Sequence, residues 1–153
     1  VLIRGTELHT TSGVTFDGVA ATNVKVLSET EVTATSPAGV PGIFDVRLQT
    51  LGGTSPITTA DRYRYTPVVS ALSPASGSHL GGTEVTVTGA GFSTKAGATT
   101  FRFGTTLGKT LGCTSSTSCT VLSPAHEVGT VTVFAVVNKI ASESRAGDTF
   151  TFE

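Results

Sequence analysis

Histidine and serine side chains are the groups in this chain whose chemistry could support nucleophilic catalysis. The three histidines all stand in predicted loops: His9, His79 and His126. Ser78 directly precedes His79, but the glycines around this pair do not form the G-x-S-x-G turn that exposes a nucleophilic serine. With so many serines in the chain, chance proximity explains the pair. The sequence therefore predicts no catalytic residues and no enzyme activity.

The acidic residues are too scattered to work in pairs or to hold a metal ion. A glycosidase needs two carboxyl groups on either side of a bond, whereas Glu29 and Glu31 are close only because they flank a predicted turn. Calcium loops need clustered Asp and Asn residues, and zinc sites need more ligands than two thiols. We therefore expect no metal site, no cofactor-binding residues and no cofactor.

The two cysteines, Cys113 and Cys119, are six residues apart with Ser115–Thr117 between them as a predicted turn. Residues placed in this way on the two arms of a hairpin lie on the same side of the sheet, so a cross-hairpin disulfide is geometrically reasonable. The alternative is two reduced thiols that act as small core side chains. A disulfide would indicate an oxidising compartment, and hence an extracellular or cell-surface location.

Charge and hydropathy exclude two classes of partner. Only 14% of the residues are charged and the net charge is −1, so the chain lacks the basic surface that nucleic-acid binding requires. No apolar run approaches the ~20 residues of a membrane span, so this segment is not expected to insert into a membrane. The chain starts at Val1 and contains no Met, and we interpret it as a piece of a longer polypeptide.

Short β-strand signals recur along the chain, and helical periodicity is almost absent. Phe44, Val46 and Leu48 alternate with polar residues, which is typical of a strand with one buried face. Such strands, separated by Gly, Pro and Ser, predict antiparallel β-sandwiches. The predicted strands lie at residues 1–3, 14–16, 24–26, 31–34, 44–48 and 63–65, and again at 69–72, 85–87, 101–103, around 113, 119–122, 131–135 and 150–152.

The chain contains one module almost twice. Landmarks such as Ser36-Pro37 and Tyr63-x-Tyr65 return 87 residues later as Ser123-Pro124 and Phe150-x-Phe152. So long a period indicates tandem domains, with expected bounds 1–66 and 67–153. The repeat also sets Cys113 and Cys119 at the positions of Val26 and Val32, which are expected to face the core. Pro67 leaves almost no linker between the copies, so the joint is expected to be stiff.

The stretch from Val69 to Phe92, VSALSPASGSHLGGTEVTVTGAGF, resembles the opening of the IPT/TIG family of immunoglobulin-like domains. The match continues through Phe101-x-Phe103-Gly104 to the end of the second copy. The first copy follows it from its second strand onward, with Asp17 in place of Gly104. The resemblance implies two tandem immunoglobulin-like sandwiches. Members of this family occur in cell-surface proteins and adhesins, beside polysaccharide-active catalytic domains, in plexin-like receptors and in Rel-type transcription factors.

The first copy has no counterpart of Pro67–Glu84, and therefore lacks its first strand. The strand at Val1, Leu2, Ile3 and Arg4 is then a possible strand-acceptor edge, because an unpaired strand can add a strand from elsewhere. Three explanations stay open: the sequence begins late in the module, the segment is disordered or cleaved, or another chain supplies the strand and so allows self-assembly.

Two functions follow from these patterns. The first is a non-catalytic extracellular spacer or protein-interaction module, whose partners are other domains of the parent polypeptide or other proteins. The alternative is an accessory or carbohydrate-binding module of a polysaccharide-active enzyme. Sugar sites stack rings on exposed aromatic residues, and Tyr63 and Tyr65, the two tyrosines, are expected in the core with their hydroxyl groups at its rim.

Overall fold

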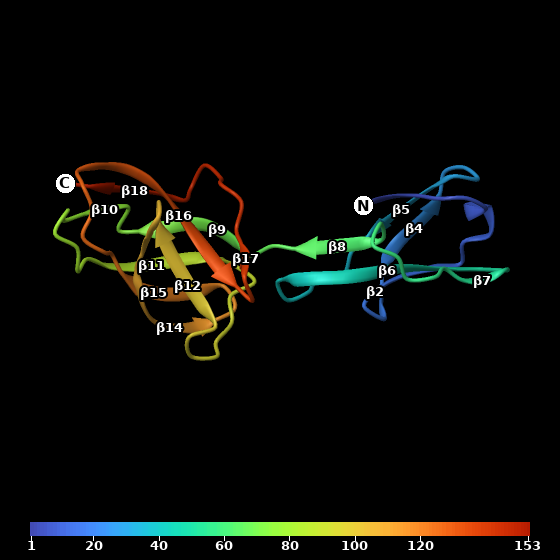
Figure 1. Ribbon diagram of the computed structural model, residues 1–153, viewed down its shortest axis with the longest axis horizontal. Coiled ribbons are helices and arrows are strands. Elements are labelled where there is room, and N and C mark those ends of the chain that lie inside the picture. Colours follow the sequence, from blue (N-terminus) through green and yellow to red (C-terminus); the bar gives the residue numbers. More distant parts are fainter. The chain divides into compact units, whose positions relative to one another are not determined.

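The computed structural model describes residues 1–153 and forms two compact units. The first unit comprises residues 1–39 and 43–65, and the second comprises residues 66–153 with residues 40–42. Each is built from two β-sheets whose pairing is antiparallel except at one place (Figure 1). The single helical segment is a 3-10 turn, η1 (Leu8–Thr10). The fold is all-β, with two tandem immunoglobulin-like sandwiches of which the first lacks its N-terminal strand.

The first unit has a three-stranded and a five-stranded sheet. The first sheet has the order β1-β5-β4, and the second has the order β3-β2-β6-β7 with β8 paired to β6. The strands are β1 (Leu2–Arg4), β2 (Gly13–Phe16), β3 (Val19–Ala20), β4 (Thr22–Val26), β5 (Glu31–Thr35), β6 (Gly42–Thr50), β7 (Gly53–Thr54) and β8 (Arg62–Tyr65).

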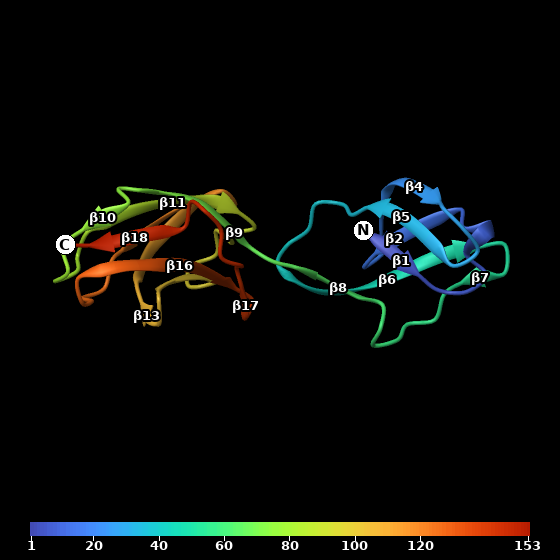
Figure 2. The same ribbon diagram turned by 90° about the horizontal axis from the view of Figure 1, so that it is seen from above.

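The second unit adds strands at the edges of both sheets. One sheet has the order β14-β15-β11-β9, and the other has the order β10-β18-β16-β12-β13 with β17 paired to β16. Both views place the green β10 beside the red β18 (Figures 1 and 2). The strands are β9 (Val68–Ser73), β10 (Ser76–Gly77), β11 (Glu84–Ala90), β12 (Thr99–Phe103), β13 (Thr106–Leu107), β14 (Lys109–Ser115), β15 (Ser118–Leu122), β16 (Gly129–Val137), β17 (Ile140–Ala141) and β18 (Thr149–Phe152).

Each unit has its own apolar core. The core of the second unit contains five phenylalanines, including Phe101, Phe103 and Phe150, all fully buried. The core of the first unit is smaller and has Phe16 at its centre. In both units the buried residues alternate along the strands with exposed polar ones, as the sequence pattern predicts.

All the longer predicted strands are present, and glycines occupy the turn before β11 and the bulge within it. Gly81 and Gly82 have φ values of +82° and +81°. The β9–β11 register shifts between Thr88 and Gly89, and Phe92 after this bulge is buried.

The prediction missed several two-residue strands, although one of them had a sequence signal. Asp17 and Gly18 both have positive φ and connect β2 to β3, which is the Asp-Gly hairpin turn. Asp17 thus takes the same left-handed conformation as Gly104, its counterpart in the second unit. No helix in the structure is both long enough and apolar enough to span a membrane.

Candidate functional site

The outer edge of β1 has no neighbouring strand. On its inner side, Val1 exchanges hydrogen bonds with Ala34, and the amide of Gly5 donates to Thr30. Because backbone groups alternate in direction along an antiparallel strand, those of Leu2, Arg4 and Thr6 point outward. We call this side of β1 the open edge. Within the predicted edge Val1–Arg4, the backbone groups of Val1 and Ile3 face β5 and those of Leu2 and Arg4 face outward.

The second unit covers the equivalent edge. β11 corresponds to β1 with an offset of 84 residues, and β9 pairs along its outer side. The residues of β11 that correspond to the open edge are Thr86, Thr88 and Ala90, and they pair with Ser73, Ala71 and Val68 of β9. The inward side chains of β9, Val69 and Leu72, complete the core. The two units therefore differ at the open edge, which β9 covers only in the second unit.

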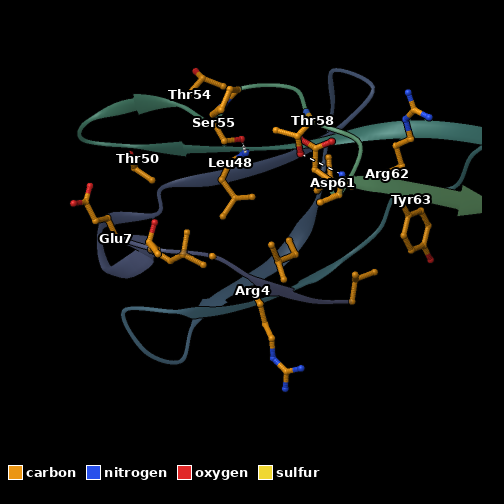
Figure 3. Close-up of a pocket in the computed structure, with 18 of the residues that line it drawn as sticks. Arg4, Glu7, Leu48, Thr50, Thr54, Ser55, Thr58, Asp61, Arg62 and Tyr63 are labelled. Atoms are coloured by element: carbon orange, nitrogen blue, oxygen red, sulfur yellow. Dashed lines mark hydrogen bonds between the residues drawn. The ribbon is translucent and has the colours of Figure 1, made fainter.

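A groove of about 820 Å³ lies between the open edge and the facing sheet (Figure 3). Its floor is apolar and includes Leu8 and Leu48, and Leu48 points into it from β6. Its rim is polar and carries Thr54, Ser55 and Thr58. Arg4 points away from the groove and pairs with Glu31 at 3.0 Å on the exposed face. An apolar floor with a polar rim suits an extended chain whose alternate side chains point inward.

Asp61 lines this groove and has an exact counterpart in the second unit. Its Oδ2 accepts a hydrogen bond from the amide of Thr58 at 2.9 Å, and Oδ2 of Asp148 accepts one from the amide of Arg145 at 2.6 Å. Asp148 is 0% exposed, whereas Asp61 is half-buried. The same local turn is thus fully enclosed in the unit that has β9, and accessible in the unit that lacks it.

Tyr63 and Tyr65 belong to the core of the first unit, as predicted. Both pack edge-to-face on Phe16, with ring centroids 5.1 Å and 6.5 Å away. The Tyr65 hydroxyl donates to the carbonyl of Pro37 at 2.9 Å. Burial raises the pKa of Tyr65 above its ordinary value of 10.0, although the Ser36 side chain acts in the opposite direction. Both rings are therefore engaged in packing, and Tyr63 also borders the groove.

Cys113 and Cys119 form a disulfide across the β14–β15 hairpin. They lie directly opposite each other, as Val26 and Val32 do in the first unit. Both cysteines face the core, as expected: Cys119 is fully buried, and Cys113 is half-buried and packs against the core.

His79 and His126 stand in loops, as predicted, whereas His9 lies in the 3-10 turn η1. Each of the two histidines in the second unit has a structural partner. The ring of His126 stacks on Phe152 at 4.9 Å, and its Nδ1 donates to the carbonyl of Glu127 at 2.9 Å. Nδ1 of His79 lies 2.8 Å from the carbonyl oxygen of Glu153. Ser78 accepts from the amide of Leu80 through its hydroxyl, which shapes the local turn. Sequence reasoning did not foresee that the loops of His79 and His126 are joined by a backbone hydrogen bond.

Comparison with known proteins gives one family and several distant structures. The IPT/TIG domain family matches residues 1–65 and, separately, residues 67–152. No curated protein matches the chain by sequence.

Among solved structures, the extracellular region of plexin A4 is 19% identical over 99% of this chain and 16% of its own, with a TM-score of 0.47. The Bacteroides ovatus protein SGBP-B, solved with a mixed-linkage heptasaccharide, is 18% identical over 100% of this chain and 41% of its own, with a TM-score of 0.40. SGBP-B from a xyloglucan utilization locus of Bacteroides uniformis is 17% identical over 96% of this chain and 44% of its own, with a TM-score of 0.42. The chain thus spans less than half of the length of each of these three solved chains.

Proposed function

The chain belongs to the IPT/TIG family, with one domain in each half, and we propose that it serves as a non-catalytic, load-bearing spacer in a larger cell-surface or secreted protein. The observation that carries this proposal is the pairing of β10, the second strand of the second unit, with β18, its last strand. β10 runs parallel to β18, with Ser76 opposite Thr151 and Gly77 opposite Phe152.

Three backbone hydrogen bonds hold this parallel pair. The amide of Thr151 donates to Ala75 at 2.9 Å, that of Glu153 donates to Gly77 at 2.9 Å, and that of His79 donates to Glu153 at 2.8 Å. We call this set the terminal clamp. It joins the N-terminal part of the unit directly to its C-terminal strand.

The parallel direction of β10 and β18 determines how the terminal clamp responds to a pulling force. When the ends of the unit are pulled apart, two parallel terminal strands slide past each other, so their hydrogen bonds are loaded together and in shear. Antiparallel terminal strands would instead open one bond at a time. The unfolding rate under force, which governs mechanical resistance, is therefore expected to be low for the second unit.

The disulfide supports the proposed location. Disulfides persist in oxidising environments and are rare in the cytosol, and Cys113–Cys119 is a formed bridge in this domain. Only 14% of the residues are charged, and the outer faces carry Thr and Ser, so the surface is polar without attracting nucleic acid.

Single-molecule force spectroscopy of the chain, held by both ends, tests the proposal. We expect two unfolding events, with the second unit unfolding at the higher force. Thr151→Pro removes the amide that donates to Ala75, and should bring the unfolding force of the second unit down towards that of the first. Thr151→Val keeps this amide and should leave the force unchanged. Circular dichroism of both variants checks that they remain folded.

Two results would contradict the spacer. One is an unfolding force of the second unit that is low from the start or insensitive to Thr151→Pro in a folded variant. The other is saturable binding of one oligosaccharide class to the chain on a glycan array, which would favour the carbohydrate-binding alternative.

A further inference from the structure

The second unit also differs from the first in its β14–β15 hairpin and in the segment that leads into β12. The hairpin carries Cys113 and Cys119 where the first unit has Val26 and Val32. The segment at residues 93–99 is three residues longer than its counterpart, because the offset between the units is 84 residues at β11 and 87 residues from β12 onward. A single pocket brings these two differences together.

This pocket has a volume of about 230 Å³ and lies between the 93–99 segment and β14. Cys113 lines the pocket and Cys119 does not. Cys113 is half-buried, whereas Cys119 is 1% exposed and belongs to the core. The pocket therefore gives a small molecule a path to one of the two sulfur atoms of the disulfide, that of Cys113.

Lys95 is the one charged residue that lines the pocket. It belongs to the longer 93–99 segment, and its ammonium group has no ion-pair partner in the structure. Thr110 lines the same pocket, and its Oγ1 is buried without a hydrogen-bond partner. A cation and a free hydroxyl donor, with no acidic side chain in the lining, favour a negatively charged ligand.

The first unit shows that the hairpin does not need a covalent link to hold its shape. Val26 and Val32 stand opposite each other without one. Val32 is fully buried and Val26 is 41% exposed. A side chain at the outer position can therefore extend into solvent, while a free Cys119 thiol would fill the inner position as a small apolar group. Opening the disulfide should thus leave the second unit folded.

From the pocket, the unpaired Lys95 and the unequal burial of the two sulfurs, we propose that Cys113 is a site of reversible mixed-disulfide formation with small thiols that carry a carboxylate. Lys95 attracts the negative charges of the incoming molecule, and Cys113 is the sulfur that it attacks. The first unit has neither the cysteines nor the longer segment, so the reaction belongs to the second unit alone. The proposal does not depend on the load-bearing role of that unit.

The reaction is a thiol–disulfide exchange. The small thiol loses its proton to water, and its thiolate attacks Sγ of Cys113. A bond forms between these two sulfurs as the bond between Cys113 and Cys119 breaks, and the electron pair of the broken bond goes to Sγ of Cys119, which takes up a proton. One thiol and one disulfide thus give one mixed disulfide and one thiol. The reverse attack by Cys119 restores the original bridge and releases the small thiol.

Three thiols of similar size test the charge preference: mercaptopropionate is negative beside its thiol, mercaptoethanol is neutral and cysteamine is positive. The rate of bridge opening by each is divided by its rate with the uncharged disulfide of mercaptoethanol at the same pH, which removes differences in intrinsic reactivity. Acid quenching and mass spectrometry of peptides locate the adduct. We expect the relative rate to be highest for mercaptopropionate and lowest for cysteamine, with the adduct on Cys113.

Lys95→Ala should lower the relative rate of mercaptopropionate by about threefold, which is the size expected for an exposed charge pair, and should remove most of the difference among the three thiols. Lys109→Ala is the matched control, because Lys109 lies on the same strand as Cys113 but does not line the pocket. It should leave the order of the three rates unchanged. Circular dichroism before and after opening follows the fold.

Four results would overturn the proposal. An adduct on Cys119 would show that the attack does not come through the pocket. Equal relative rates for the three thiols, or equal effects of Lys95→Ala and Lys109→Ala, would remove the role of Lys95. Loss of the folded signal of the second unit on opening would show that the bridge is required for the fold. A bridge that none of the three thiols opens in the folded chain would show that the pocket gives no access to Cys113.

Discussion

At the scale of single residues, a glycine can be required where two backbone segments approach each other closely. Gly89 and Gly5 are equivalent and have the same neighbours on the inner side of the sheet, since Gly89 donates to Thr117 and Gly5 donates to Thr30. They differ in what lies outside. Only Gly89 has a carbonyl oxygen, that of Val68, in the position where its Cβ would stand.

The two glycines should therefore respond differently to the same substitution. Gly89→Ala is expected to destabilise the second unit by about 2–3 kcal/mol, because backbone rather than a flexible side chain must move. Gly5→Ala should stay within about 0.5 kcal/mol of the unsubstituted chain. Urea denaturation of both variants measures these free energies of unfolding. Equal losses in the two variants would mean that the approach of β9 is not what requires Gly89.

At the scale of elements, the two units contain equivalent hairpins that differ in one pair of opposed residues. β4–β5 sets Val26 opposite Val32, and β14–β15 sets Cys113 opposite Cys119. Val32 and Cys119 are both buried and Cys113 packs against the second core, whereas Val26, which was also expected to face the core, is 41% exposed. The disulfide adds a covalent link that closes a loop of few residues, so its effect on the unfolded chain is moderate.

The two hairpins suggest a matched pair of double substitutions. Cys113→Val with Cys119→Val recreates the pair of the first unit and should cost about 2 kcal/mol or less, since the lost link is partly offset by apolar packing. Cys113→Ser with Cys119→Ser should cost more, because it also buries a hydroxyl group at position 119. Thermal unfolding followed by circular dichroism ranks the variants. A Val pair that is less stable than the Ser pair would refute this account of the hairpin.

At the scale of the whole molecule, two separate cores imply two separate unfolding transitions. The core of the second unit contains 13 buried residues, whereas that of the first contains 7 and borders the groove. Since stability grows with the apolar area buried, the first unit should unfold first.

Tyrosine fluorescence can follow the first unit alone. The chain has two Tyr and no Trp, and both tyrosines lie in β8. In a urea titration, the tyrosine signal should change at the lower denaturant concentration, and circular dichroism should show a second transition at a higher one. Coincident midpoints for the two signals would contradict independent units of unequal stability.

Strand alternation, turn residues and the internal repeat were sufficient to predict the class of fold, the longer strands, most of the buried faces and the partner of each cysteine. These features depend on neighbours in the sequence or on comparison of one copy with the other, so they are visible in the residues. The absence of a counterpart to Pro67–Glu84 also pointed to β1 as an edge.

Tertiary structure alone decided which backbone groups of β1 face outward, that a groove opens beside Asp61, and that β10 runs parallel to β18. It also showed that Gly5 and Gly89, which occupy equivalent positions in the repeat, have different surroundings. The physical reason is that these properties arise where segments far apart in the chain meet: β9 with β11, or β10 with β18. Register, direction and close approach between such segments follow from packing of the whole unit.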